Sequence, residues 1–396
     1  MSKPLHILQI IPSVSLVYGG PSQMVLGLSK ALAEKGVEVT ILTTDSNGDV
    51  GQPPLDVPCD RPISQDGYQI RYFHCSPFRR YKFSLGLLQW LAQHGREFDL
   101  AHIHALFSPV SSLAATVARH QQLPYILRPL GTLDPADLQK KRQLKQLYAA
   151  VLERPNLRGA AALHFTSDQE AKISERFGTM SRELVLPLGV KPVEQNLQAR
   201  QVMRAQYAIP GDRPIILFMS RLDRKKGFDL LLPALQQLAA AGQDFHFVLA
   251  GSNSQDPDYE QEIFAQIQQS TLKERTAIAG FVTGEDKAML LQAADLFVLP
   301  SYYENFGIAV AEAMVAGVPV VISDQVYIWD QIQQAEAGWV SPCTVSGLVE
   351  QLRLALADSA ERQRRGENAK AHALKNYSWG AIAQQMIATY HQILHP

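Results

Sequence analysis

The sequence predicts an α/β protein with two doubly wound domains, each a parallel sheet with helices on both faces. Short β-rich apolar runs alternate with amphipathic helical stretches in two series, over residues 5–190 and 214–324. The polar stretch 191–213 separates them and contains no strand pattern. The length of 396 residues also exceeds one ordinary core, so two or three domains are expected. Such alternation is typical of parallel sheets covered by helices.

The first series opens with a strand pattern at 5–12, a helical pattern at 22–36 and a second strand pattern at 37–44. Leu28 and Leu32 belong to the apolar face of this helix, and Gly36 ends it. Further strands are expected at 68–75, 99–106, 124–131, 162–167 and 183–190. Helices fit between most of these strands.

The second series has strand patterns at 214–222, 245–252, 275–282, 296–301 and 319–324, with room for a helix between each pair. In the last stretch of the chain, Ile382, Met386 and Tyr390 recur at helical spacing. We therefore divide the chain into an N-terminal domain of residues 1–195, a C-terminal domain of residues 196–376 and a tail helix of residues 377–396.

Composition excludes several functional classes. The net charge of −1 argues against nucleic-acid binding as the main activity. The sequence has no run of about 18 apolar residues, and the first apolar run ends at Pro12, which favours a buried strand over a signal peptide. The 3 cysteines form no CxxC pair, so neither a thiolate metal site nor a disulfide framework is expected. These features predict a cytoplasmic protein.

Ligands of open α/β sheets bind beyond the carboxyl ends of the strands, so the residues that follow each strand are the candidate site. Glu304 and Glu312 lie eight positions apart after the strand at 296–301. A helix is expected from Phe306 to Ala316, with Asn305 as its N-cap. Its free amides and dipole favour an anion.

Two cations follow the strand at 214–222. Arg221 comes directly after it, and Lys226 precedes Gly227 at the start of another helix. This combination suits a diphosphate and can neutralise a leaving group. Glycines follow three further strands, including Gly251 in the second series and the pair Gly19 and Gly20 in the first. They allow close approach of a ligand to the backbone.

The sequence does not contain the complete Rossmann fingerprint, a P-loop, H-E-x-x-H or G-x-S-x-G. What it does contain resembles the retaining GT-B glycosyltransferases, and more narrowly glycosyltransferase family 4. The segments "ENFGIAVAE", "SRLDRKKGFDLLLPAL" and "ADLFVLPSYYENFG" are similar to motifs of that family, and "GGPSQMVLGLSKALAEKG" fits its N-terminal half. The resemblance covers nearly the whole chain and is most specific in the second half.

The resemblance implies a GT-B fold and transfer of a sugar from a nucleotide-sugar donor, with retention of configuration and without a metal or cofactor. Arg221 and Lys226 would bind the donor diphosphate, Glu304 the transferred sugar and Glu312 the ribose. The remaining donor contacts implied are Gly19, Gly20, Gly251, Phe281, Val282, Asn305, Phe306, Gly307 and Ile308. The donor would be a UDP-, GDP- or ADP-sugar and the acceptor a glycan or a lipid-linked molecule.

One position departs from the family. Related members often have histidine where "RPLGTLDP" has Leu130, and leucine cannot donate a hydrogen bond to a sugar. His102, His104 or Arg128 could supply the missing contact on the acceptor side, and we include His104 among the catalytic candidates with Arg221, Lys226 and Glu304. For the two histidines the alternative is a satisfied place in the core, since their spacing puts both on one sheet face. For Asp134, the alternatives are an N-cap and a site role.

Lys140, Lys141, Arg142 and Lys145 make the helix that contains them basic and amphipathic. The alternatives are a solvated face and peripheral contact with an anionic membrane surface or a lipid-diphosphate acceptor; the segment 78–83 adds further cations. The function that these patterns favour is a retaining glycosyltransferase of polysaccharide or glycolipid biosynthesis. A nucleotide-sugar epimerase or hydrolase of the same fold, and a non-catalytic donor-binding partner, stay open as alternatives.

Overall fold

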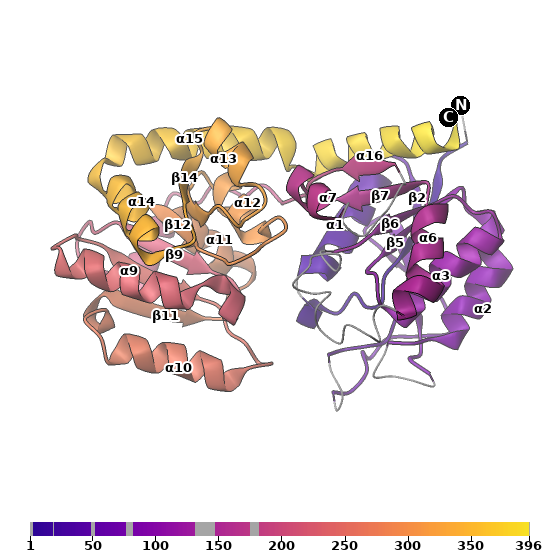
Figure 1. Ribbon diagram of the computed structural model, residues 1–396, viewed down its shortest axis with the longest axis horizontal. Coiled ribbons are helices and arrows are strands. Elements are labelled where there is room, and N and C mark those ends of the chain that lie inside the picture. The colour runs from indigo at the N-terminus through magenta and orange to yellow at the C-terminus, as the bar shows by residue number, and fades with distance from the viewer. Residues whose placement is uncertain are drawn as a thin grey trace. The chain divides into compact units, whose positions relative to one another are not determined.

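The computed structural model describes residues 3–18, 20–48, 52–76, 82–130, 147–174 and 182–395. The chain forms two compact units, and each is described by itself (Figure 1). The first unit contains residues Met1–Gly189 and Trp379–Pro396, and the second contains Val190–Ser378. The chain therefore leaves the first unit after Gly189 and returns to it at Trp379.

In the described part of the first unit, eight strands form one sheet in the order β3-β4-β2-β1-β5-β6-β7-β8. All neighbours are parallel except β3 and β4, which are antiparallel. The strands are β1 His6–Ile10, β2 Glu38–Thr44, β3 Ile63–Gln65, β4 Tyr68–Phe73, β5 Leu100–His104, β6 Tyr125–Arg128, β7 Ala162–Phe165 and β8 Glu183–Val185.

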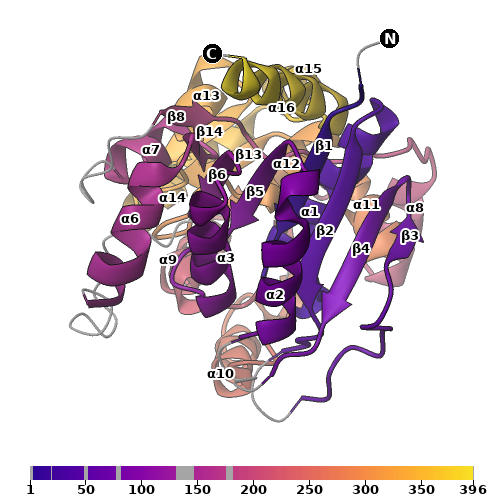
Figure 2. The ribbon, with the colours of Figure 1, turned by 90° about the vertical axis from the view of Figure 1, so that its right-hand side faces the viewer.

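Helices cover both faces of this sheet. Their bounds are η1 Leu16–Tyr18, α1 Gly20–Glu34, α2 Leu85–His94, η3 Gly95–Glu97, α3 Pro109–His120, a π-helical turn η4 Ala149–Glu153, α6 Arg154–Gly159, α7 Asp168–Ser174 and α16 Trp379–Leu394. The Ser84 hydroxyl caps α2 by accepting from the Leu87 amide at 3.3 Å. Helices α2 and α3 pack side by side along the sheet (Figure 2).

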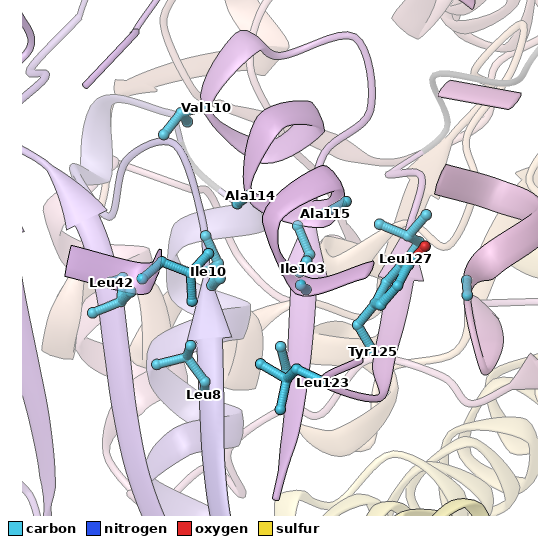
Figure 3. Packing of buried hydrophobic residues seen from close by; sticks show 14 of the residues in the cluster. Leu8, Ile10, Leu42, Ile103, Val110, Ala114, Ala115, Leu123, Tyr125 and Leu127 are labelled. Atoms are coloured by element: carbon cyan, nitrogen blue, oxygen red, sulfur yellow. The ribbon is translucent and has the colours of Figure 1, made fainter. Parts of the chain in front are cut away.

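An apolar core fills the space between the sheet and the helices α2 and α3. Leu8 and Ile10 of β1, Ile103 of β5 and Leu127 of β6 point from the strands toward Ala114 and its neighbours on α3 (Figure 3). The small residues of α3 let the helix lie close to the sheet, and alternate residues of β1, β5, β6 and β7 contribute to this core. The residues between them therefore face the other side of the sheet.

That other side carries α1 and α16. Here Trp379 of α16 lies against two glycines: a Cβ added at Gly27 of α1 would meet its ring at 2.4 Å, and one at Gly189 would meet it at 2.2 Å. The absence of side chains at these two positions makes room for the indole. The start of α16 is thus fixed on the first unit by α1 and by the segment that follows β8.

In the second unit the sheet order is β11-β10-β9-β12-β13-β14, with all strands parallel. The strands are β9 Ile215–Met219, β10 His246–Ala250, β11 Thr276–Gly280, β12 Leu296–Leu299, β13 Val320–Ser323 and β14 Gly338–Ser341. The central strands β9, β10 and β12 are buried along their whole length, as expected for a parallel sheet covered on both faces.

The helices of the second unit are α8 Ala199–Gln206, η6 Arg224–Lys226, α9 Phe228–Ala240, α10 Pro257–Gln268, η7 Lys273–Arg275, α11 Gly284–Ala293, α12 Ile308–Val315, α13 Trp329–Gln334, α14 Val345–Ala357 and α15 Ser359–Asn376. Side chains cap several of them: Asp256 caps α10, Thr344 caps α14 and Asp358 caps α15. Helix α8 lies in the polar stretch that separates the two strand series.

The predicted fold class, two parallel-sheet α/β domains, is confirmed. The sequence patterns do not predict two of the strands. β3 has only three residues and pairs antiparallel to β4 across a tight turn at Asp66 and Gly67, both with positive φ. β14 is short and begins with Gly338, whose Cβ would meet the carbonyl oxygen of Val320 at 2.1 Å. Within the described residues, no helix is long and apolar enough to cross a membrane.

Candidate functional site

The segments that follow β9 and β12 meet at the carboxyl edge of the second unit's sheet. Gly227 brings them together: it has φ of 74°, and a Cβ there would meet the carbonyl oxygen of Pro300 at 2.2 Å. The Tyr302 amide donates to the Lys225 carbonyl at 2.8 Å. Any larger residue at position 227 would push the two segments apart, so this glycine fixes their spacing.

Lys226 and Glu304 form an ion pair across this junction. The Lys226 side chain is 7% exposed and that of Glu304 is 19% exposed. Burial alone would raise the pKa of Glu304, but attraction from Lys226 and Lys225, with the hydrogen bond from Lys226, lowers it below its usual value. The carboxylate is therefore ionised near neutral pH, where it can accept hydrogen bonds from hydroxyl groups.

The backbone of Glu304 is held from the other side by the segment after β13. The Glu304 amide donates to the Gln325 carbonyl at 3.0 Å, and the Tyr327 amide donates to the Glu304 carbonyl at 2.8 Å. These two bonds make a short parallel bridge between Glu304 and Val326. The carboxylate thus stands on a backbone fixed at the ends of three neighbouring strands, β9, β12 and β13.

Helix α12 begins at Ile308, with three residues between it and Glu304. The prediction that Asn305 caps a helix starting at Phe306 is wrong, because the cap is Gly307, with φ of 72°, and the helix starts at Ile308. Phe306 is buried and packs edge-on against Tyr377. A glycine cap has no side chain to bond the first-turn amides. The Val310 amide donates to the Gly307 carbonyl at 2.8 Å, so the amides of Ile308 and Ala309 are the ones that a ligand can accept from.

Glu312, on the second turn of α12, is paired with a lysine that the sequence patterns did not indicate. Its Oε1 lies 2.5 Å from Nζ of Lys287 on α11, and the side chains are 18% and 26% exposed. Lys287 comes from a separate helix, 25 residues earlier in the chain, so spacing alone cannot reveal the pair. Glu312 is accordingly neither an isolated buried charge nor a partner of Glu304.

Arg221 lies after β9, with its side chain 49% exposed; its guanidinium approaches Gln255 at 3.3 Å and Asp223 at 3.8 Å. Gly251 lies after β10, where a Cβ would meet the Ser220 carbonyl oxygen at 1.9 Å. Phe281, after β11, is 76% exposed, and Val282 beside it is half-buried. Each predicted donor residue of the second unit except Glu312, which lies on the second turn of α12, therefore follows the carboxyl end of a strand or opens a helix there.

Lys225 differs from expectation, because the pattern "DRKK" indicates that Arg224 and Lys225 face solvent. Arg224 is exposed and stacks over Tyr259. Lys225 is half-buried, with Nζ 4.8 Å from the centre of the Tyr303 ring. Burial lowers the pKa of Lys225, and attraction from Glu304 opposes this. Lys225 therefore adds a second positive charge beside Glu304.

In the first unit the candidates His102, His104 and Arg128 lie on one face of the sheet, below α1 and α16, and are fully buried. His102 Nδ1 is 3.2 Å from the Tyr390 hydroxyl, and His104 Nε2 is 2.7 Å from Gln9 Oε1. Neither histidine touches solvent, which favours the core alternative over contact with a substrate. The sequence had not indicated a third member, His164, whose Nδ1 lies 3.2 Å from His102 Nε2.

Burial lowers the pKa of all three histidines, to about 3 for His102. It also lowers the pKa of Arg128, to about 10, although Glu170 opposes this. The charged Arg128 reinforces the effect on the histidines. The imidazoles are therefore neutral at physiological pH.

Residues with strained backbone conformations lie where β5 and β6 end. Ala105 and Phe107 after β5 have φ of 69° and 57°, and Leu130 after β6 has φ of 56°. Non-glycine residues adopt this region at a cost, and such residues concentrate at functional sites. The buried carboxylate of Glu153 helps to hold this turn, since its Oε1 accepts from the Phe107 amide at 2.6 Å. The strained residues mark this edge as the candidate acceptor side.

Gly20 is the first residue of α1. Several predictions fall outside the described residues: Gly19, Asp134, most of the basic segment 78–83, and the basic cluster of Lys140, Lys141, Arg142 and Lys145. Within the described residues, the loops around Glu304 and Glu312 hold no group of three metal-ligating side chains. The arrangement instead offers cations and helix amides for an anion, with ionised Glu304 as a hydroxyl acceptor.

Comparison with known families assigns both halves of the chain. Residues 199–372 match the family described as Glycosyl transferases group 1. Residues 19–189 match the family described as Glycosyl transferase 4-like domain. The two matches follow one another along the chain and correspond to its two strand series.

Among individual proteins, the chain is 27% identical to a D-inositol 3-phosphate glycosyltransferase of Xylanimonas cellulosilytica, over 94% of this chain and 92% of that one. It is 30% identical to an alpha-D-kanosaminyltransferase of Streptomyces kanamyceticus, over 61% and 63% of the two chains. Its fold is similar to sucrose-phosphate synthase from Thermosynechococcus elongatus (TM-score 0.76, 24% identity, 98% and 99% covered). HepE from Anabaena, solved with UDP and glucose, is also similar (TM-score 0.74, 20% identity, 98% and 100% covered). Together, the two family matches and these folds show that the chain belongs to the group 1 glycosyltransferases, with a glycosyltransferase 4-like N-terminal domain and the GT-B fold.

Proposed function

We propose that this protein transfers a sugar, with retention of configuration and without a metal, from a nucleotide-sugar donor to a glycan or lipid-linked acceptor. The observation that carries the proposal is the Lys226–Glu304 pair beside the N-terminal end of α12. It places a cation, an ionised hydroxyl acceptor and helix amides next to one another. A sugar diphosphate requires these three groups.

Structures of similar fold support a nucleotide-sugar donor. Anabaena HepE was solved with UDP and with UDP-glucose, and starch synthase IV of Arabidopsis thaliana with ADP and acarbose. These ligands belong to proteins that are less than 25% identical to this chain, and they differ in the base. We therefore assign the donor class to the second unit and leave the base to experiment.

In the proposed reaction the bond between the anomeric carbon and the diphosphate breaks while the acceptor hydroxyl bonds to the same face of that carbon. Lys226, Arg221 and the amides of α12 neutralise the charge that develops on the departing diphosphate. Glu304 orients the sugar by accepting from its hydroxyl groups. Glu312, with Lys287 beside it, accepts from the ribose. The proton of the acceptor leaves with the diphosphate, because both glutamates are already engaged in ion pairs.

The test is a panel of UDP-, GDP- and ADP-sugars with glycan and lipid-linked acceptors. Release of nucleoside diphosphate that depends on an acceptor supports transfer, and the anomeric configuration of the product tests retention. Activity that survives a chelator supports the metal-independent mechanism. A changed sugar without release indicates an epimerase, release without an acceptor indicates a hydrolase, and binding without turnover indicates a non-catalytic partner. A preliminary thermal-shift screen selects the donor, since a bound ligand raises the apparent stability.

Replacing Lys226 with alanine tests the site assignment. The variant leaves the Glu304 carboxylate without its closest cation and removes a group that stabilises the leaving diphosphate. We expect kcat/KM to fall by about 100-fold or more. Arg224→Ala is the matched control, because this cation lies two residues earlier, is exposed and contacts Tyr259 instead. Full activity of Lys226→Ala, or equal losses in both variants, would contradict the assignment.

A further inference from the structure

Three metal-ligating side chains from separate stretches of the first unit meet at the carboxyl edge of its sheet. They are Asp45, Cys59 and His74, and one ligand atom of each lies within 4.8 Å of the other two. Asp45 Oδ2 and His74 Nδ1 are 2.9 Å apart. None of the three belongs to the candidate transferase site described above.

The sheet itself creates this arrangement. Strands β2 and β4 are parallel neighbours in which Thr44 pairs with Phe73, so the residues that follow, Asp45 and His74, emerge side by side. The Asp45 amide continues the ladder by donating to the Phe73 carbonyl at 2.9 Å. Cys59 approaches from the connection between β2 and β3.

The carboxylate is oriented by the backbone. Asp45 is 6% exposed, and its Oδ1 accepts a hydrogen bond from the Cys75 amide at 2.9 Å. This bond fixes the carboxylate and directs Oδ2 to His74. Such support of a ligand by a neighbouring donor is typical of protein metal sites. The partner of Asp45, His74, is 76% exposed in its side chain, so an ion can reach the group from solvent.

We propose that Asp45, Cys59 and His74 bind a zinc ion. Thiolate, imidazole and carboxylate together are the ligands of Zn²⁺, whereas Mg²⁺ and Ca²⁺ prefer oxygen alone. Tetrahedral zinc bonds of about 2.0–2.3 Å separate ligand atoms by roughly 3.5 Å. The three ligand atoms, which all lie within 4.8 Å of one another, are close to that separation. Water or the neighbouring Cys75 thiol, which is close enough to Cys59 to interact electrostatically, completes the coordination.

The ion would act as a structural clip. Strand β2 ends at Thr44 and β3 begins at Ile63, and the described residues between them form no helix or strand. The Leu55 amide donates to the Asp45 carbonyl at 2.9 Å, and the Ser13 hydroxyl donates to the Ser46 carbonyl at 2.7 Å. A metal that ties Cys59 to the sheet edge closes this long connection and stabilises the loop after β1 that rests on it.

The direct test is zinc binding by the full chain, produced without a histidine tag and stripped with a chelator. We expect one equivalent of Zn²⁺ in competition with a chromophoric chelator, and thiolate-to-metal absorption when Co²⁺ replaces zinc. Cys59→Ser should weaken binding by about 100-fold or more and remove that absorption. Cys343→Ser is the matched control, since this cysteine belongs to the second unit, and it should bind zinc as the natural protein does.

A second variant keeps the test independent of folding. His74→Ala removes an exposed side chain, so the protein should fold while losing zinc affinity and the rise in melting temperature that zinc causes in the natural protein. A thiol titration tests the competing explanation, which is a disulfide between Cys59 and Cys75. Absence of stoichiometric binding, unchanged affinity in both variants, or a Cys59–Cys75 disulfide in the purified protein would overturn the proposal.

Discussion

At the residue scale, the charges of the candidate donor site are buried in pairs. Removal of an ion from water is costly unless a partner and hydrogen bonds compensate for it. Lys226 compensates Glu304, and Lys287 compensates Glu312. The two acids in "ENFGIAVAE" therefore do not form an acid/base pair. Each has its own lysine, and each is a candidate acceptor for a different group of the donor.

The Glu312–Lys287 pair leads to a prediction at this scale. Glu312→Gln removes a charged acceptor, so the dissociation constant of the preferred nucleoside diphosphate should rise about 10-fold or more. Lys287→Gln keeps the acceptor and removes only a group that orients it, so the loss should be smaller. Calorimetric titration of both variants and of the double variant measures the two effects and their coupling.

The order of these losses is the critical outcome. If Lys287→Gln weakens binding as much as Glu312→Gln does, lysine itself contacts the ligand. If neither variant changes the affinity, the pair serves the packing of α11 against α12 and not the ligand. The first result would add Lys287 to the proposed ribose contact, and the second would remove Glu312 from it.

At the element scale, the candidate donor site depends on the N-terminal end of α12 more than on the rest of the helix. Glu304 and the first-turn amides of α12 are separated by only three residues, and Gly307 makes the turn between them. A Cβ at this position would lie 3.1 Å from Val310 Cγ2 and 3.5 Å from Glu304 Cγ. The glycine therefore meets a conformational requirement and a spatial one.

Gly307→Ala separates these two requirements when it is compared with Gly242→Ala. Both glycines have positive φ, of 72° and 77°, but a Cβ at Gly242 meets nothing within 4 Å. Each variant should lose about 1–2 kcal/mol of stability through backbone strain. Only Gly307→Ala should also lose donor turnover, by about 10-fold or more, because its Cβ crowds Val310 at 3.1 Å and so shifts the first turn of α12 beside Glu304.

Denaturant unfolding and steady-state kinetics measure the two quantities. Equal kinetic losses in the two variants would attribute the effect to general destabilisation. Unchanged turnover in Gly307→Ala would show that the position of Glu304 does not depend on this turn.

At the scale of the whole molecule, the two units have the same kind of fold but differ in the side chains that their sheets bury. The second unit buries mostly apolar strands, with His246 of β10 as a buried exception, and most of its predicted site residues lie at the strand ends. The first unit places Gln9, His102, His104 and His164 on the face of the sheet opposite its apolar core, with Tyr390 of α16 among them. Residues almost 400 positions apart in the chain thus share one buried polar layer.

This layer predicts a pH dependence of stability. His102, His104 and His164 are held neutral, with pKa values below the ordinary 6.5. Arg128 and the neighbouring imidazoles face them, and the Tyr390 hydroxyl lies beside His102. The unfolded chain binds protons as the pH falls through 6.5 while the folded chain does not. Stability is therefore full above that pH and is lost below it, by roughly 1 kcal/mol per pH unit for each histidine.

Hydrogen exchange at about pH 7.5 and about pH 5.5, corrected for intrinsic rates, would resolve this effect by segment. Protection of β5, β6 and β7 should fall more than that of β12 and β13 in the second unit. His164→Gln should reduce the difference. The prediction is wrong if both units lose protection equally or if the variant keeps the full pH dependence.

The sequence alone determined the fold class, most strands and the order of the donor-side residues. Period-2 and period-3.6 patterns are local, and parallel strands bring the residues that follow them to a common edge without further information. For the same reason Arg221, Lys226 and Glu304 could be proposed together. The sequence patterns did not predict the short strands β3 and β14 or the glycine cap of α12. Segments of a few residues are too short to show a recognisable period.

Only the tertiary structure decided which charges pair and which polar groups are buried. Lys287 reaches Glu312 from another helix, and Tyr390 reaches His102 from the far end of the chain. The 3 cysteines form no CxxC pair and so predict no metal site, yet Cys59 joins Asp45 and His74 because β2 and β4 are neighbours. Such pairings depend on which strands and helices are adjacent in space. Spacing along the chain does not encode this adjacency.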